Sequence, residues 1–405
     1  MLKKLLESHG QNIYKKLPLS KEITKELEEI NWDIFAKQLC AVKEHTSKTK
    51  QAVSPLNPLT EPLSHTHPSP ALRNKNIGCL IMAGGQATRL KMDTPKGIIP
   101  VSPLRHKSLL QIIAERVLAF SDCYETTVPL AIMTSTFSKQ AIVDHFTENN
   151  FFGLPPGRVF FCAQESLPFL DMDSQLIIDS ANGLAQGPNG NGMLFSTCSK
   201  VLQKWAQEQI EVVSIIQVDN PLIDPFHPAV LSPLFSGHDL TAAAIERNDP
   251  HEKVGIFVKK EGHTTVLEYS EFTPEQLSSA FKWANISFFA STIDFALKAT
   301  THTLPLHIAK KKFQGEDVWK AEYFIFDHLP LAQNPVIVPV DRSLFFSPVK
   351  NKDGNCSIET AQKAMIERDK NRLQELTGTS TSEIVELPQQ AYYPTDTFVE
   401  KSKDS

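Results

Sequence analysis

Short, mostly apolar runs alternate with helical stretches from about residue 76 onward, and this alternation limits the fold more than any other feature of the sequence. The apolar runs are "IGCLIM", "VPLAIMTS", "RVFFCAQ" and "VVSIIQV", and the helical stretches include "LLQIIAERVLAFS" and "SKQAIVDHFTEN". Continuous apolar strands are buried on both faces, which is typical of parallel sheets covered by helices on either side. Right-handed strand-helix-strand units follow from that arrangement. The sequence therefore predicts an α/β, Rossmann-like domain with a mainly parallel sheet.

Between about residues 240 and 290 the apolar runs follow one another without helices between them. They read "LTAAAIERN", "KVGIFVKK", "TTVLEYSEF" and "KWANISFFA". Closely spaced strands are typical of antiparallel pairs, because a parallel pair needs a long crossover connection. We therefore expect a mixed sheet, in which these strands extend the parallel core and form a substrate-side lobe.

The two ends of the chain differ from this central pattern. Residues 1–75 begin with apolar positions three to four apart, which predicts helices, and end in a stretch with five prolines, which predicts an extended linker. The last part closes with a helical stretch and a polar tail. The sequence thus predicts a helical N-terminal extension and linker over 1–75, a catalytic domain over 76–335, and a small C-terminal domain over 336–405.

Charge and composition exclude several classes of partner. The chain has 41 Lys and Arg against 46 Asp and Glu, so no basic excess favours nucleic acid. No run of about 18 apolar residues predicts a membrane span, and the N-terminus lacks the features of a signal peptide. The six cysteines are widely spaced, which favours buried, reduced thiols over a metal site. We expect a cytoplasmic protein with no membrane or nucleic-acid partner.

A glycine turn with two cations follows the first apolar run, in "IMAGGQATRLKMDTPKGIIP". Gly84 and Gly85 stand where the strand should end, and a glycine turn at that edge lets backbone N–H groups approach a phosphate. Arg89 and Lys96 would add positive charge to such a site. The stretch matches neither the P-loop nor the dinucleotide fingerprint, so an ordinary loop with a solvated lysine remains an alternative.

Two later motifs carry polar groups suited to a nucleotide. In "LAQGPNGNG" the short amides of Asn189 and Asn191 lie between glycines and can bond a flat base or a sugar hydroxyl, although an ordinary polar turn explains them too. In "SIIQVDNPL" an apolar run leads to Asp219, a hard oxygen ligand that suits Mg²⁺. The alternative for Asp219 is a cap on the following turn. Asn285 lies inside the apolar run "KWANISFFA", where its amide needs a partner.

Taken in order along the chain, these motifs resemble one known family. The signature run "MAGGQATRLKMDTPKGIIPVSPLRHKSLLQ" is similar to the corresponding loop of the UDP-N-acetylglucosamine pyrophosphorylases, within the UDP-sugar pyrophosphorylase superfamily of uridylyltransferases. "RVFFCAQESLPFL", "LAQGPNGNGMLF", "IIQVDNPL", "KVGIFVKKEGHTTVLEYSEF", "WANISFF", "HIAKKKF" and "FFSPVKN" follow in family order. The resemblance covers roughly residues 76 to 365 and implies a nucleotidyltransferase fold of glycosyltransferase-A type.

The resemblance implies a role for particular residues. The uracil edge would be read by the side chains of Gln86 and Gln164, with help from the backbone around Gly84, Gly85 and Gly190. The sugar hydroxyls and the acetamido group would be held by Asn191, Glu268 and Asn285, with Gly255 giving close backbone access.

For the phosphates the resemblance implies contacts from Arg89, Lys96 and Lys350, with Mg²⁺ on Asp219. The sugar 1-phosphate would attack the α-phosphorus of UTP and expel pyrophosphate. Two departures stand in the signature loop, where the family has glycine and this chain has Ala87 and Lys91. Glucose or galactose instead of the N-acetyl sugar, or a nucleotide-sugar-binding regulator without catalysis, remain alternatives.

Overall fold

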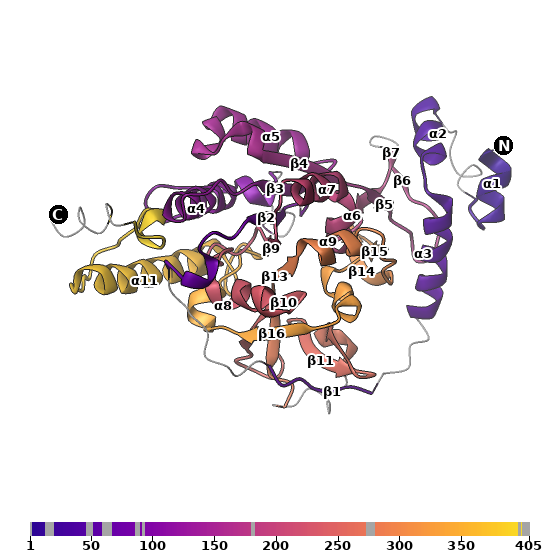
Figure 1. The fold of residues 1–405 in the computed structure, drawn as a ribbon. Coiled ribbons are helices and arrows are strands. Elements are labelled where there is room, and N and C mark those ends of the chain that lie inside the picture. Colours follow the sequence, from indigo (N-terminus) through magenta and orange to yellow (C-terminus); the bar gives the residue numbers. More distant parts are fainter. Residues whose placement is uncertain are drawn as a thin grey trace. The chain divides into compact units, whose positions relative to one another are not determined.

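A computed structural model shows a mixed sheet of ten strands among the residues that it describes (Figure 1). Four predicted runs form neighbouring strands, in the order β9 (Val212–Gln217), β2 (Ile77–Met82), β3 (Leu130–Ser135) and β4 (Val159–Gln164). Strand β2 runs parallel to β3 and to β9, and all of its residues are buried. The continuous apolar runs therefore form the parallel core that the sequence predicted.

The strands between residues 240 and 292 extend this core with antiparallel pairs. Strand β13 (Trp283–Thr292) is antiparallel to β9, to β10 (Leu240–Glu246) and to β11 (Ile256–Lys260). Strand β12 (His263–Leu267) pairs with β11, and β16 (Pro335–Pro339) runs parallel to β10. The prediction of an α/β, Rossmann-like mixed sheet is confirmed.

The structure describes residues 2–12, 20–45, 52–58, 67–85, 90, 94–179, 183–272, 280–395 and 398. They group into two compact units, each assembled from separate stretches of chain. Unit 1 consists of Met1–Gln51, Gln164–Met193 and Thr303–Asp327. Unit 2 consists of Ala52–Ala163, Leu194–His302 and His328–Ser405. The predicted domain limits at 75/76 and 335/336 stay predictions.

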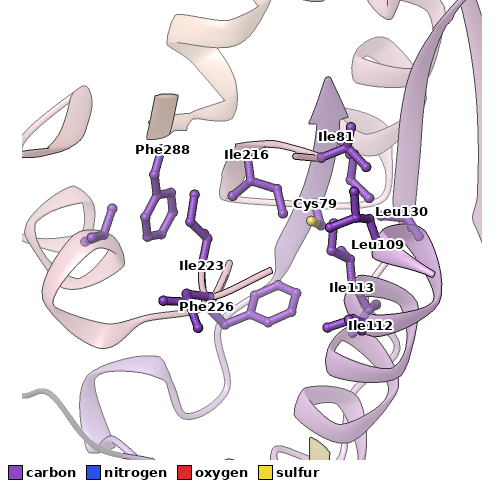
Figure 2. Close-up of a cluster of buried hydrophobic side chains, with 14 of the residues drawn as sticks. Cys79, Ile81, Leu109, Ile112, Ile113, Leu130, Ile216, Ile223, Phe226 and Phe288 are labelled. Carbon is purple, nitrogen blue, oxygen red and sulfur yellow. The ribbon is translucent and has the colours of Figure 1, made fainter. Parts of the chain in front are cut away.

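In unit 2, helices cover both faces of the sheet. Neighbouring residues of β2 point to opposite faces, so Gly78 faces one helix layer and Cys79 the other. A Cβ atom on Gly78 would lie 2.6 Å from the ring of Trp205 in α7 (Ser199–Gln207). Figure 2 shows Cys79 and Ile81 among the buried side chains of α4 (Leu109–Cys123). The glycine thus allows a tryptophan to pack directly on the strand.

The remaining elements of unit 2 are short helices and one long C-terminal helix. They are α5 (Lys139–Glu148), α6 (Leu194–Thr197), α8 (Pro228–Leu231), α9 (Ile293–Ala299), α10 (Arg342–Phe345) and α11 (Ile358–Thr377), with β1 (Ser54–Pro55) at the edge of the sheet.

Unit 1 contains the N-terminal helices and a long hairpin. The helices are α1 (Leu2–Ser8), α2 (Lys21–Glu28) and α3 (Trp32–His45), and the hairpin is β14 (His307–Phe313) with β15 (Glu316–Glu322). Ser20 starts α2, because its hydroxyl accepts a hydrogen bond from the Ile23 N–H. Unit 1 also holds the small pairs β5 (Ser166–Pro168) with β8 (Gln186–Pro188) and β6 (Ile178–Asp179) with β7 (Gly183–Leu184).

Buried apolar side chains of the helices and the hairpin form one core in unit 1, including Leu27 and Phe35 from the helices and Trp319 from β15. The expected helical extension therefore packs on later parts of the chain. No helix among the described residues is long and apolar enough to cross a membrane. The six cysteines are free, but the predicted burial holds fully only for Cys79 and Cys198, since Cys40 on α3 is exposed.

Residues 386–394 form a segment, named here the C-terminal strap, which is fastened to unit 2 by buried polar groups. The Leu387 N–H donates to Asp369 Oδ2 over 2.8 Å, and Arg372 Nε donates to Ala391 O over 2.7 Å. Arg116 Nε donates to the side-chain oxygen of Gln389 over 2.7 Å. These bonds hold the strap against α4 and α11.

Asp224 is the half-buried carboxylate to which the end of the strap is bonded. Its Oδ1 accepts from the Tyr393 hydroxyl, and its Oδ2 lies 3.2 Å from Nε2 of His67. Burial alone raises the pKa of Asp224, but the hydrogen bond and charge of His67, with the His227 charge and the Tyr393 hydroxyl, bring it below the unfolded value. Asp224 thus joins the Pro-rich linker to the strap.

We predict that Asp224→Asn lowers the free energy of unfolding by about 2 kcal/mol at neutral pH, because it removes the charge of a half-buried carboxylate that is hydrogen-bonded to His67 and Tyr393. The pKa of Asp224 is lowered on folding from 3.8, so its contribution is present above that value and is lost as the pH falls below it. Urea unfolding at several pH values would measure this. Asp122→Asn, an exposed change on α4, is the control; an equal effect of both changes would contradict the prediction.

Candidate functional site

The glycine turn lies at the end of β2, as predicted. Past Met82 the chain is still held by its neighbours, because Ala83 N donates to Met133 O over 2.8 Å. Gly84 is buried and Gly85 is exposed. The predicted uracil and phosphate residues Gln86 and Arg89, together with Ala87 and Lys91, lie outside the described residues. Their roles stay predictions.

Lys96 and Asp219, which are 123 residues apart, meet beyond the ends of β2 and β9. Lys96 Nζ lies 3.3 Å from Asp219 Oδ2, and the two side chains are only 16% and 5% exposed. Lys96 begins a 3₁₀ turn (Lys96–Ile98), and a Cβ on Gly97 would lie 2.6 Å from Leu110 in α4. The glycine therefore lets this turn pack closely on α4. Lys96 is therefore not a solvated loop lysine.

The turn after β9 is capped by Asn220 and not by Asp219. Asn220 Oδ1 accepts from the Leu222 N–H over 3.3 Å, whereas the Asp219 carboxylate accepts from Lys96 Nζ over 3.3 Å. Asn220 was not among the predicted site residues. Its position directly after the apolar run was visible in the sequence, but its partners were not.

Lys350 reaches the same strand end from the C-terminal part of the chain. The Val349 N–H donates to Asp219 O over 2.7 Å, and the Lys350 N–H donates to Cys356 O over 2.7 Å. Burial raises the pKa of the Cys356 thiol, and the charges of Lys350 and Asp219 act on it in opposite directions. The backbone next to Lys350 thus lies beside Asp219, which is paired with Lys96. The phosphate roles of these three residues stay predictions.

The three predicted sugar residues of unit 2 also lie together. Asn285 N donates to Gly255 O over 2.9 Å, and a Cβ on Gly255 would lie 3.3 Å from Glu268 Oε1. Part of the hydrogen-bonding capacity of these side chains is used by contacts within the protein. Asn285 Oδ1 accepts from Ser287 N over 2.9 Å, and Glu268 caps a 3₁₀ turn (Tyr269–Glu271). The side-chain oxygen of Asn285 therefore finds its hydrogen-bond partner in its own strand.

In unit 1, the "NGNG" loop packs directly on the backbone of Tyr323. Gly190 has φ +103° and a Cβ there would lie 2.3 Å from Tyr323 O, so only glycine fits. Tyr323 N donates to Asn189 O over 2.9 Å, and Ile325 N donates to Asn191 Oδ1 over 3.0 Å. The carbonyl of Asn191, a predicted sugar ligand, thus fastens the loop.

Gln164 has the buried side chain expected of a ligand-binding group in unit 1. It is 3% exposed, and within the described part of the chain its Oε1 has no hydrogen-bond partner. Asn189 Oδ1 shares this condition, and the two positions are close because Asn189 N donates to Glu165 O over 3.0 Å. The unpaired oxygen is consistent with the predicted role of Gln164, but Gln38 Oε1 is also buried and unpaired, so the role stays a prediction.

The carboxylate of Asp219 is a possible Mg²⁺ ligand. Among the described residues, no group of three or more His, Cys, Asp or Glu is placed to hold a metal ion. A single buried carboxylate still fits Mg²⁺, which takes one or two carboxylates and fills its other positions with phosphates and water. The assignment of Mg²⁺ to Asp219 stays a prediction. His307 has a structural partner, since its Nε2 lies 2.8 Å from Asp327 Oδ2.

We predict that Gly190→Ala destabilises unit 1 by more than about 2 kcal/mol, because the added methyl group meets backbone that must move. Gly315→Ala is the matched control. Gly315 also has positive φ, but no atom lies near its Cβ position, so only the backbone cost of about 1 kcal/mol applies. Chemical unfolding of both variants would measure the difference. Equal losses would mean that the Tyr323 contact is unimportant.

Known proteins match the chain along most of its length. Residues 17–403 match the family described as UTP–glucose-1-phosphate uridylyltransferase. UDP-N-acetylglucosamine diphosphorylase 1 of Arabidopsis thaliana is 32% identical over 320 residues, which are 72% of this chain and 63% of that protein. UDP-N-acetylglucosamine pyrophosphorylase of Saccharomyces cerevisiae is 30% identical over an alignment that covers 73% of this chain and 69% of the yeast protein. The fold is also that of the Trypanosoma brucei uridine diphosphate N-acetylglucosamine pyrophosphorylase, with TM-score 0.74 and 24% identity over 88% of this chain and 80% of that one.

Proposed function

The chain belongs to the UTP–glucose-1-phosphate uridylyltransferase family, and from this premise we propose that it forms UDP-N-acetylglucosamine and pyrophosphate from UTP and N-acetylglucosamine 1-phosphate. The observation that carries the proposal is the ion pair of Lys96 with Asp219 at the end of β9, where the backbone of Val349, the neighbour of Lys350, bonds Asp219. The names of the relatives favour the N-acetyl sugar over glucose or galactose. A cytoplasmic location is part of the proposal.

In the proposed reaction an oxygen of the sugar phosphate attacks the α-phosphorus of UTP, and the bond to the β-phosphate oxygen breaks. The nucleophile is already an anion, so no general base is required. The protein's work is alignment and charge neutralisation, which dominate phosphoryl and nucleotidyl transfer. Lys96 and Lys350 supply the positive charge. Mg²⁺ held by Asp219 would add Lewis-acid neutralisation of the phosphates.

The sugar would be bound by the cluster of Gly255, Glu268 and Asn285. Gly255 lets the Val266 side chain pack closely, since a Cβ would lie 2.8 Å from it, and this packing places Glu268 and Asn285 beside the glycine. Asn285 Oδ1 is bonded to Ser287, so the Nδ2 amide is the end suited to a sugar oxygen or to the acetamido carbonyl. This cluster supports a hydroxyl-rich ligand in the same unit as the phosphate contacts.

Pyrophosphate release from UTP and Mg²⁺ tests the proposal, with N-acetylglucosamine, glucose and galactose 1-phosphates compared by kcat/KM. The N-acetyl sugar should be preferred. A preference for glucose or galactose would replace the sugar assignment. Binding of UDP-N-acetylglucosamine without any pyrophosphate release would favour the regulator.

We predict that Lys96→Ala lowers kcat about a hundredfold, corresponding to about 3 kcal/mol, because its charge is most needed as pyrophosphate leaves. KM for UTP should change much less. Lys282→Ala, which removes a lysine in an exposed ion pair with Glu246, is the control and should keep the parental kcat. Steady-state kinetics at saturating substrates would measure both. Parental kcat in Lys96→Ala would remove this residue from the reaction.

We predict that Gln164→Ala reduces the preference for UTP over CTP in kcat/KM by about tenfold, because the buried amide no longer matches the uracil edge. Sugar preference should stay the same. Gln38→Ala is the control in unit 1, since Gln38 is equally buried and donates to Pro168 O over 2.8 Å. An unchanged UTP preference in Gln164→Ala would place base reading elsewhere, with Gln86 next to be tested.

A further inference from the structure

Asn220 is a buried amide that joins two distant parts of unit 2. It follows Asp219 at the end of β9 and is only 2% exposed. Its Nδ2 donates to Phe345 O over 2.7 Å, and its Oδ1 accepts from Ser347 N over 3.2 Å and from Leu222 N over 3.3 Å. One side chain therefore bonds both its own turn and a segment about 125 residues later.

The segment reached by Asn220, residues 345–350, is the one that carries Lys350. Phe345 is buried at its start, where its ring lies 4.7 Å from the ring of His227. Near its end, Val349 N donates to Asp219 O over 2.7 Å. Asn220 and the backbone of Asp219 thus fix the segment at three points before Lys350. The place of Lys350 at the strand end depends on these bonds.

Only an amide can make this junction. The Nδ2 group must donate to a carbonyl while Oδ1 accepts from N–H groups, and a carboxylate of the same shape has no donor. An apolar side chain would leave the Phe345 carbonyl and the Ser347 N–H without this partner. A side chain of similar size that lacks either the donor or the acceptor therefore cannot replace Asn220.

The turn that follows Asn220 is also held by buried guanidinium groups. Arg368 Nη1 lies 3.5 Å from the carbonyl oxygens of Pro221 and Leu222, and Arg116 Nη1 donates to Ile223 O. These contacts remain when Asn220 is changed. Loss of the Asn220 side chain should thus release residues 345–350 more than it disturbs the turn or β9.

We propose that Asn220 is a positioning residue, which acts through residues 345–350 to hold Lys350 at the phosphate end of β9. The inference rests on the proposed function for its catalytic part. Misplacement of a phosphate contact by about 1 Å can cost up to about a hundredfold in rate, so a residue that touches no substrate can still control turnover.

A double-mutant cycle tests this with Asn220→Ala, Lys350→Ala and the double variant. We expect Asn220→Ala to lower kcat about tenfold, Lys350→Ala to lower it further, and the double variant to match Lys350→Ala within about twofold. Effects that multiply, or a parental kcat in Asn220→Ala, would overturn the proposal. Thr241→Val is the control: Thr241 is buried, its hydroxyl donates to Val230 O over 2.8 Å, and its effect should combine independently with Lys350→Ala.

Hydrogen exchange of the same full-length variants gives a second measurement that does not depend on turnover. Asn220→Ala should speed exchange at residues 345–350 and leave Ile77–Met82 unchanged, and unchanged exchange at 345–350 would also overturn the proposal. If the alanine variant does not fold, Asn220→Asp is compared by hydrogen exchange alone, because it keeps the acceptor and lacks the donor but adds a negative charge beside Asp219. A parent enzyme that releases no pyrophosphate would overturn the proposed function, and exchange would still decide whether Asn220 holds the segment.

Discussion

The ion pair between Lys96 and Asp219 is the constraint on which the rest of the site depends. Both side chains are largely withdrawn from water, and each charge alone would be costly to bury. The pair exists because three separate features deliver it: the end of β9, the Gly97 contact that seats the Lys96 turn on α4, and the backbone bond from Val349 to Asp219. At this strand end a cation that could contact a triphosphate is therefore already paired with a carboxylate.

Around that strand end, the turn over residues 220–224 is held rigid by polar groups that have no role in the proposed chemistry. Asp224 bonds the linker and the strap, while Arg116 and Arg368 donate to backbone carbonyls of the turn. Removing one partner of such a group leaves the other without its hydrogen bond, which costs about 1–3 kcal/mol. The C-terminal strap therefore stabilises the turn that follows Asp219.

Much of the fold could be predicted from the sequence, because the positions of the strands follow from the pattern of apolar residues. The apolar runs identified the strands, and the rule that ligands bind beyond the ends of parallel strands brought Lys96 and Asp219 together. The sugar roles of Gly255, Glu268 and Asn285 came only from the resemblance, although the apolar run around Asn285 marked its amide as one that needs a partner. Asn220 and the strap were missed, because a hydrogen bond between residues about 125 positions apart leaves no pattern in either stretch. The assembly of unit 1 from three stretches was missed for the same reason.

The proposed reaction also explains why a salt bridge, and not a free lysine, stands at this place. An isolated charge is costly to bury, and a buried pair of opposite charges avoids part of that cost. Lys96 Nζ lies 3.3 Å from Asp219 Oδ2, so the net charge of the pair is zero. A triphosphate brings its own negative charge, so Lys96 can exchange one anionic partner for another with little change in local charge. Asp219 thus balances the charge of Lys96 in the absence of substrate. The site can then accept an anion although it carries no uncompensated positive charge beforehand.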